Sequence, residues 1–180
     1  LDNTGNLAVE VYFYAAPHHF FPELPRLGHQ LTLPANYNQV NWYGRGPHEN
    51  YADRKASTHV GAYKATVDEL YFPYVRPQEN GYHTEVRWIA LTDEDNRVIH
   101  VPGQPLVGFG AQHFDKYDYD TFDKAGLHPH ELTKRPYTYL NVDFLQRGIG
   151  GTDSWGYSPL HKYRVNWRDY RYAFVITPII

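Results

Sequence analysis

The sequence contains no cysteine, no long apolar run and no long run of charge of one sign. Without cysteine there is neither a disulfide framework nor thiolate chemistry, so the cellular compartment stays undecided. Without an apolar stretch of about 20 residues we expect no membrane-spanning helix, and no signal peptide is recognisable. The near-balanced net charge of −3 argues against nucleic acid and against an acidic membrane surface as partners.

Aromatic residues, by contrast, are abundant: they make up 17% of the 180 residues, and tyrosine is the most numerous. A chain of this length can bury a sizeable core, and we treat residues 1–180 as a single domain. Tyrosine- and proline-rich chains with short apolar runs favour β structure. Because the chain starts at Leu1 rather than at methionine, we expect a processed chain or a domain cut from a longer one.

Alternation of apolar and polar residues predicts about ten short strands. The clearest is Leu7 to Ala15, where every second side chain is apolar. One short helix is expected near Asp118 to Ala125, with Gly126 ending it. Short strands separated by turns favour an antiparallel β-sandwich. The other expected strands cover residues 27–33, 40–43, 57–70, 82–91, 97–101, 106–114, 137–145, 163–167 and 170–177.

Three of the tryptophans are expected to have packing roles. Trp42 and Trp88 lie inside alternating strands, which predicts core positions for both. Within residues 82–91, the alternation places Val86 on the same face as Trp88. Trp167 follows a predicted strand and is also expected to pack.

The most unusual stretch is residues 147–156, RGIGGTDSWG, with four glycines in the nine positions 148–156. Glycine tolerates positive φ and close backbone approach, so this stretch predicts a shaped loop. The loop presents Trp155 beside Asp153 and Ser154, which together can offer a flat apolar face and hydrogen bonds to a sugar ring. The alternative is that Trp155 folds back into a small core. No helix is expected after the glycines, which argues against phosphate as the ligand.

Metal binding is not predicted. The two tight histidine pairs, His18–His19 and His128 with His130, have no carboxylate at the spacing of a structural zinc site. We expect surface or helix-capping roles for these histidines.

The acidic residues of the loops are Glu49, Asp53, Glu79 and Asp153. A glycosidase needs two carboxyl groups about 5 to 10 Å apart, and the sequence does not pair any of these. Glu49 and Glu79 each precede an asparagine, and Asp53 precedes an arginine. This pattern favours hydrogen-bond networks that brace the loops, with Asp53 or Glu49 paired to an arginine. The sequence has neither a serine nucleophile elbow nor a dinucleotide fingerprint.

Four motifs, in this order and spacing, carry a resemblance to a known family. They are LPRLG at 24–28, WYGRGPHENYADR at 42–54, YVRPQENG at 74–81 and GIGGTDSW at 148–155. Together they resemble the C-terminal, small-chain domain of the large β-galactosidases of glycoside hydrolase family 2. The resemblance covers nearly the whole chain from Leu24 onward.

The resemblance implies a large antiparallel β-sandwich, or supersandwich, similar to galactose mutarotase. In the family this domain closes over a (β/α)₈ barrel of the same parent chain. The two catalytic glutamates and the Mg²⁺ and Na⁺ ligands belong to that barrel, so we expect no catalytic residue, metal or cofactor in this chain. The parent would release terminal β-linked galactose by a retaining mechanism, and the fragment alone would be inactive.

The resemblance also implies site residues and partners. Trp155 matches the family's tryptophan that contacts the substrate, and Asp153 and Ser154 would help to hold its loop. The expected partners are a galactoside and the barrel. The family's upstream strands, with their arginine- and aspartate-rich motif, are not found in this sequence. Unpaired sheet edges would then favour association between copies.

Two other readings stay open. A free-standing carbohydrate-binding or aldose-mutarotase-like module would need a histidine and a carboxylate that converge, for example His83 and Glu79. A purely architectural domain that mediates subunit contacts is the third possibility.

Overall fold

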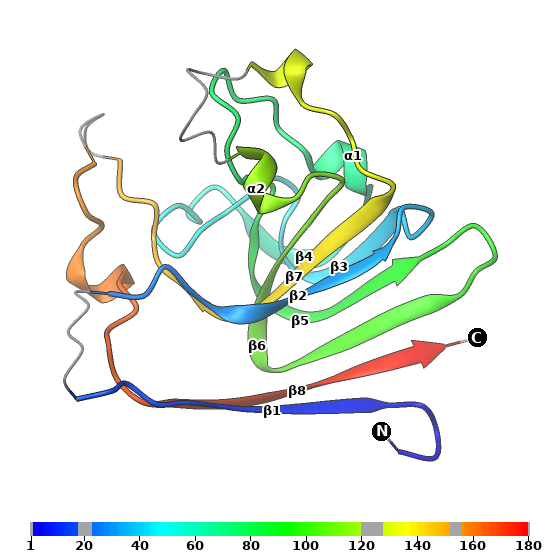
Figure 1. The fold of residues 1–180 in the computed structure, drawn as a ribbon, viewed down its shortest axis with the longest axis horizontal. Helices are drawn as coiled ribbons and strands as arrows, with labels where there is room; N and C mark the ends of the chain where they lie inside the picture. Colours follow the sequence, from blue (N-terminus) through cyan, green and yellow to red (C-terminus); the bar gives the residue numbers. More distant parts are fainter. Residues whose placement is uncertain (1, 18–22, 120–127, 152–155, 180) are drawn as a thin grey trace.

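The computed structural model describes residues 2–17, 23–119, 128–151 and 156–179 (Figure 1). In these ranges the chain forms eight strands, all paired antiparallel, and the predicted all-β class is confirmed. The strands are β1 (Leu7–Phe13), β2 (Arg26–Pro34), β3 (Gln39–Gly46), β4 (His59–Thr66), β5 (His83–Thr92), β6 (Val98–Gln112), β7 (Tyr137–Gln146) and β8 (Tyr170–Ile179). The helical segments are α1 (Val67–Leu70), α2 (Lys116–Tyr119), η1 (Pro129–Glu131) and η2 (His161–Tyr163).

The strands form one curled sheet. Its order is β1-β8-β6-β5-β3-β4, and β7 joins β6 and carries β2 on its other side. The start of β6 pairs with β8 and its end pairs with β7, so one long strand serves two neighbours in turn. Figure 1 shows β6 turning upward away from the β1 and β8 pair, which lies along the bottom of the view.

Strand β6 joins two segments, 97–101 and 106–114, that the sequence predicts as separate strands. Pro102 and Pro105 lack backbone N–H donors, and they lie between the part of β6 that pairs with β8 and the part that pairs with β7. A Cβ on Gly103 would lie 2.2 Å from the carbonyl oxygen of Val86, so only glycine permits this approach of β6 to β5.

Three other expectations need correction. The predicted strand 163–167 is irregular: η2 ends at Tyr163, and among the described residues the segment makes a single bridge, from Val165 to Leu24. The predicted strand 57–70 ends at Thr66, which caps helix α1 through a capping box with Glu69. The predicted helix near Asp118 starts earlier, as α2, and residues 120–127 lie outside the described residues. In the described ranges, no helix has the length and apolar character to span a membrane.

The core lies against the sheet and contains Trp42, which is 1% exposed, as predicted. Trp88 is only half-buried, and its ring lies 6.2 Å from that of His100. The register of β5 against β6 shifts between Val86 and Trp88, so simple alternation fails there. Of these two residues, Val86 enters the core and Trp88 does not. The buried members of the core are Val40, Trp42, Val67, Leu70, Val86, Ile89, Leu91, Val101, Val107, Phe109, Ala111, Leu140, Val142, Tyr172, Phe174 and Ile176.

Candidate functional site

The glycine-rich loop follows β7 and is described as far as Gly151. Gly150 and Gly151 have φ angles of 76° and 93°, a left-handed region that residues with side chains rarely adopt. The predicted shaped loop is therefore confirmed in this part. Asp153, Ser154 and Trp155 lie outside the described residues, and their roles stay predictions.

The carboxylate of Asp53 holds this loop. Its Oδ1 accepts a hydrogen bond from the backbone N–H of Ile149 at 3.0 Å, and its Oδ2 accepts one from Gly150 at 2.8 Å. A Cβ on Gly148 would lie 2.6 Å from the same carboxylate, so this approach also requires glycine. The predicted bracing role of Asp53 is confirmed, and its partners are backbone N–H groups rather than an arginine side chain.

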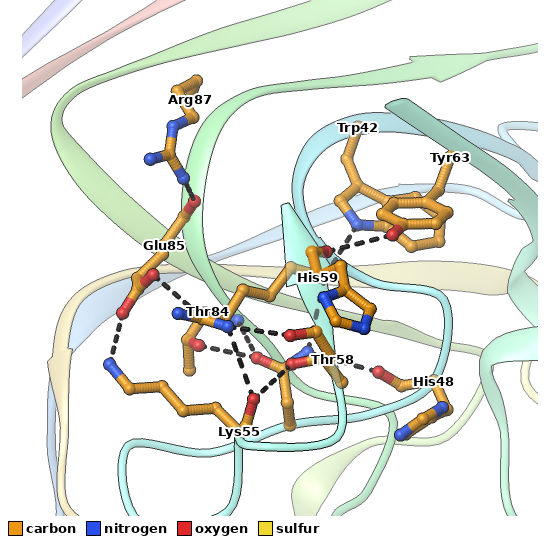
Figure 2. Close-up of polar contacts among 11 residues, drawn as sticks. Trp42, His48, Lys55, Thr58, His59, Tyr63, Thr84, Glu85 and Arg87 are labelled. Carbon is orange, nitrogen blue, oxygen red and sulfur yellow. Dashed lines mark hydrogen bonds and ion pairs between the residues drawn. The ribbon is translucent and has the colours of Figure 1, made fainter. Parts of the chain in front are cut away.

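The segment that carries Asp53 connects β3 to β4 and is anchored on β5. The carboxylate of Glu85 accepts a hydrogen bond from Nε of Arg45 at 2.7 Å and forms an ion pair with Lys55 (Figure 2). Nη1 of Arg45 donates a hydrogen bond to the carbonyl of Thr58 at 2.9 Å. Burial raises the pKa of Glu85, but the bonds from Lys55 and Arg45 outweigh it, and the net pKa is lowered. These contacts fix the position from which Asp53 reaches the glycine-rich loop.

Two buried asparagines brace the neighbouring loops. Oδ1 of Asn50 accepts the backbone N–H of Thr84 at 2.9 Å. Oδ1 of Asn80 accepts the backbone N–H of Phe72 at 2.8 Å and the side-chain amide of Gln112 at 2.9 Å. The predicted hydrogen-bond networks around the two Glu-Asn pairs are thus confirmed.

Glu49 links two loops that are distant in sequence. It accepts hydrogen bonds from the hydroxyl of Tyr74, from the backbone N–H of Gly81 at 2.8 Å and from the hydroxyl of Tyr51 at 3.4 Å. Burial is the larger cause that raises the pKa of Tyr74 to about 12, and the neighbouring Glu49 carboxylate adds to it. The same two causes raise the pKa of Tyr51 still further. Both hydroxyls therefore stay protonated at neutral pH.

An open cleft adjoins the base of the glycine-rich loop. Its volume is about 310 Å³, and its walls come from the segment before β2, the two loops joined by Glu49 and the end of β7. The lining residues are Pro25, Glu49, Tyr51, Arg54, Tyr74, Gln78, Glu79, Gln146, Arg147, Gly148 and Ile149.

A buried charge cluster lies beneath Glu79. Arg26 forms an ion pair with Glu79, and its Nε lies 3.1 Å from Oδ2 of Asp143, whose side chain is 1% exposed. Burial raises the pKa of Asp143 to about 7, although Arg26 opposes this shift. The cluster connects the cleft wall to strands β2 and β7. The sequence predicted neither this cluster nor the cleft, because their members come from segments that are far apart along the chain.

His83 does not converge with Glu79, as a mutarotase-like site would require. Its two ring nitrogens lie 3.0 Å from the carbonyl of Gly81 and 3.2 Å from that of Pro47. Burial lowers the pKa of His83 to about 4, although the hydrogen bonds to the carbonyls of Pro47 and Gly81 oppose this shift. Glu79 is paired with Arg26 instead. His83 is therefore a core residue without access to a substrate.

The histidine pairs give no metal site in the described residues. The rings of His128 and His130 lie 5.7 Å apart at η1, and His18 and His19 lie outside the described residues. In the described part of the chain, no three or more His, Cys, Asp or Glu residues group together in a way that could hold a metal ion.

Comparison with known proteins gives a consistent result. Residues 1–176 match the family described as beta galactosidase small chain. The chain is 34% identical over 180 residues to a beta-galactosidase of Priestia megaterium, covering 99% of this chain and 17% of that protein. It is 41% identical over 157 residues to a beta-galactosidase of Vibrio cholerae, covering 86% of this chain and 14% of that protein. The chain thus spans less than a fifth of the length of these relatives.

Proposed function

Because this chain belongs to the beta-galactosidase small-chain family, we propose that it forms one wall of the sugar-binding pocket of a β-galactosidase. The parent enzyme would hydrolyse terminal β-linked galactose, as in lactose. The observation that supports this role is the clamp of Asp53 on Ile149 and Gly150, which fixes the start of the loop that leads to Trp155.

In this proposal the chemistry comes from carboxylates encoded elsewhere in the parent chain. A retaining glycosidase uses one carboxylate as the nucleophile and another as the acid and base. The indole of Trp155 supplies a flat apolar face against the sugar or the leaving group, and stacking of this kind contributes about 1 kcal/mol. Asp153 and Ser154 help to hold the loop. Mg²⁺ and Na⁺ would bind in the catalytic barrel.

The curled sheet would be completed in the parent chain. Among the described residues, the sheet order ends at β1 and β4, and β2 pairs with β7 alone. Further strands of the parent would extend these edges into the large antiparallel sandwich of the mutarotase type. Edges that stay uncovered would favour contacts between copies of the enzyme.

The test is substitution of Trp155 in the full-length parent enzyme. Trp155→Ala is expected to raise KM for lactose about fivefold to tenfold, because the apolar platform is lost. Trp155→Phe should restore part of the affinity. Trp88→Phe, at a half-buried position on β5, serves as the matched control and should leave KM unchanged. If Trp155→Ala behaved like the control, the proposed role would be wrong.

A further inference from the structure

The glycine-rich loop leaves β7 and returns toward β8 through two arms that lie side by side. The backbone N–H of Gly148 on the outgoing arm donates a hydrogen bond to the carbonyl of Tyr163 on the returning arm at 2.8 Å. A Cβ on Gly150 would lie 2.5 Å from the carbonyl oxygen of Tyr157, so the arms approach closely at a second point. We call the part of the loop marked by these four residues the neck. The position of a compact loop whose ends lie close together is set at such a neck.

The segment that precedes β2 lies against both arms of the neck (Figure 1). The backbone N–H of Arg147, at the start of the outgoing arm, donates to the carbonyl of Pro25 at 3.0 Å. Beyond the returning arm, the carbonyl of Val165 accepts a hydrogen bond from the N–H of Leu24 at 2.8 Å. These two bonds bring the preceding residue, Glu23, to the neck.

The carboxylate of Glu23 faces one arginine from each arm. Its Oε1 lies 2.9 Å from Nη2 of Arg147, and its Oε2 lies 3.9 Å from Nε of Arg164. The Glu23 side chain is 15% exposed, and the two arginine side chains are 32% and 34% exposed, so water screens these ion pairs less than pairs on the open surface. Nε of Arg164 also donates to the carbonyl of Pro159 at 2.8 Å, which fixes this guanidinium on the returning arm.

Loss of the Glu23 charge should loosen the neck. Without it, the guanidiniums of Arg147 and Arg164 would share no carboxylate, and repulsion between like charges favours separation of the two arms. Oε2 of Glu23 is buried and accepts no hydrogen bond in the described part of the chain, so the nearby guanidiniums are needed to offset its charge. Asp53 holds Gly150 from a different segment, so the two carboxylates act at different points of the loop.

We propose that Glu23 is a positioning residue of the glycine-rich loop, which fixes both arms of the neck through Arg147 and Arg164. In the parent enzyme it would determine where the loop meets the sugar, and that part of the proposal rests on the function proposed above.

Hydrogen–deuterium exchange of the full-length parent enzyme tests the proposal without reference to activity. Glu23→Gln keeps the size of the side chain and removes its charge, and we expect the amides of residues 147–150 and 157–165 to exchange about tenfold faster. Glu10→Gln is the matched control, because Glu10 also pairs with an arginine, Arg171, but does so between strands β1 and β8. It should leave exchange in the neck unchanged. Equal exchange rates in the two variants would overturn the proposal.

A variant that lacks both arginines shows whether Glu23 acts through them. In the double variant Arg147→Gln/Arg164→Gln, the further substitution Glu23→Gln should have little additional effect on exchange in the neck. An undiminished effect in that background would assign the role to other contacts of Glu23 and would also overturn the proposal. Exchange of the β3 and β5 amides, which should be the same in all variants, shows that each variant is folded.

Steady-state kinetics separates this inference from the proposed function. If the neck positions the loop for the sugar, Glu23→Gln should raise KM for lactose about threefold to fivefold and change kcat by less than about twofold. A general loss of stability would instead lower the amount of active enzyme and leave KM unchanged. Faster exchange with an unchanged KM would keep Glu23 as the residue that fixes the neck and would refute the role proposed for the loop at the sugar. Unchanged exchange would refute the role of Glu23 alone, whatever Trp155→Ala does to KM.

Discussion

The carboxylate of Asp53 accepts a hydrogen bond from the backbone N–H of Gly150, 97 residues further along the chain. It also accepts the N–H of Ile149, so one side chain fixes two successive peptide groups of the glycine-rich loop. The loop shape thus depends both on glycines that allow positive φ and on a carboxylate supplied by a distant segment.

Removing this clamp should affect substrate binding rather than chemistry. In the parent enzyme, Asp53→Asn replaces an accepting oxygen by an amide group that cannot accept, at a cost of about 1 to 2 kcal/mol in loop positioning. We expect KM for lactose to rise by at most the roughly fivefold to tenfold expected for Trp155→Ala, with a smaller change in kcat. Steady-state kinetics measures both values.

A double-mutant cycle with Trp155→Ala tests whether Asp53 acts through the loop. If it does, Asp53→Asn should have little further effect once the indole is absent. Equal effects of Asp53→Asn in both backgrounds would show that Asp53 acts through another part of the enzyme.

Gly148→Ala should reproduce the Asp53→Asn defect without changing any polar group. The added Cβ would lie 2.6 Å from the Asp53 carboxylate and would push it away from the loop, and overpacking of this kind costs about 1 to 3 kcal/mol. Gly110→Ala is the control, because its nearest contact, Cδ2 of Tyr82, is at 3.8 Å. The prediction fails if the two variants have the same KM.

Asp143 should make the β2–β7 region less stable as the pH rises. Its folded-state pKa of about 7 is above the ordinary value of 3.8, so the folded state keeps a proton that the unfolded chain has released. This contribution is fully present below about pH 4 and is lost as the pH rises through 7.

The stabilising contribution of Asp143 that is lost over this range is about 4 kcal/mol, and Asn at position 143 does not titrate. We therefore expect the free energy for local opening of β2 and β7 in Asp143→Asn to increase, relative to that of the wild type, between pH 5 and pH 8. Hydrogen–deuterium exchange of the β2 and β7 amides in the parent enzyme measures this difference at each pH. A difference that is the same at both values would mean that Asp143 titrates normally.

His83 should have the opposite pH dependence. Burial lowers its pKa from 6.5 to about 4 in the folded state, so the unfolded chain binds the proton first. The stability is fully present above about pH 6.5 and falls by about 3 kcal/mol as the pH drops to 4. His83→Gln should remove this slope, as measured by amide exchange of β3 and β5 at pH 4.5 and 7.5. A slope that persists in the variant would assign the titration to another group.

Alternation of apolar and polar residues predicts strands reliably where a strand pairs regularly with its neighbours. The predicted strand 27–33 lies within β2, and the predicted strand 137–145 lies within β7, because alternation is a local property. At Trp88 the same rule fails, because a register shift against β6 changes the face of the sheet and no feature of β5 alone reveals it. The predicted strand 163–167 is wrong because, in the part of the chain that the structure describes, this segment makes a single bridge and no ladder with another strand.

The sequence alone determined the all-β class, most strand positions, the glycine-rich loop and the bracing roles of Asp53 and the Glu-Asn pairs. These features depend on side-chain alternation, on the φ range of glycine and on short-range polar patterns. Only the tertiary structure decided that Asp53 meets Gly150, that Arg26 meets Asp143 in a buried pair, and that two loops and the end of β7 enclose a cleft. Those contacts join residues roughly 100 positions apart, and they follow from the register and curl of the sheet rather than from any local segment.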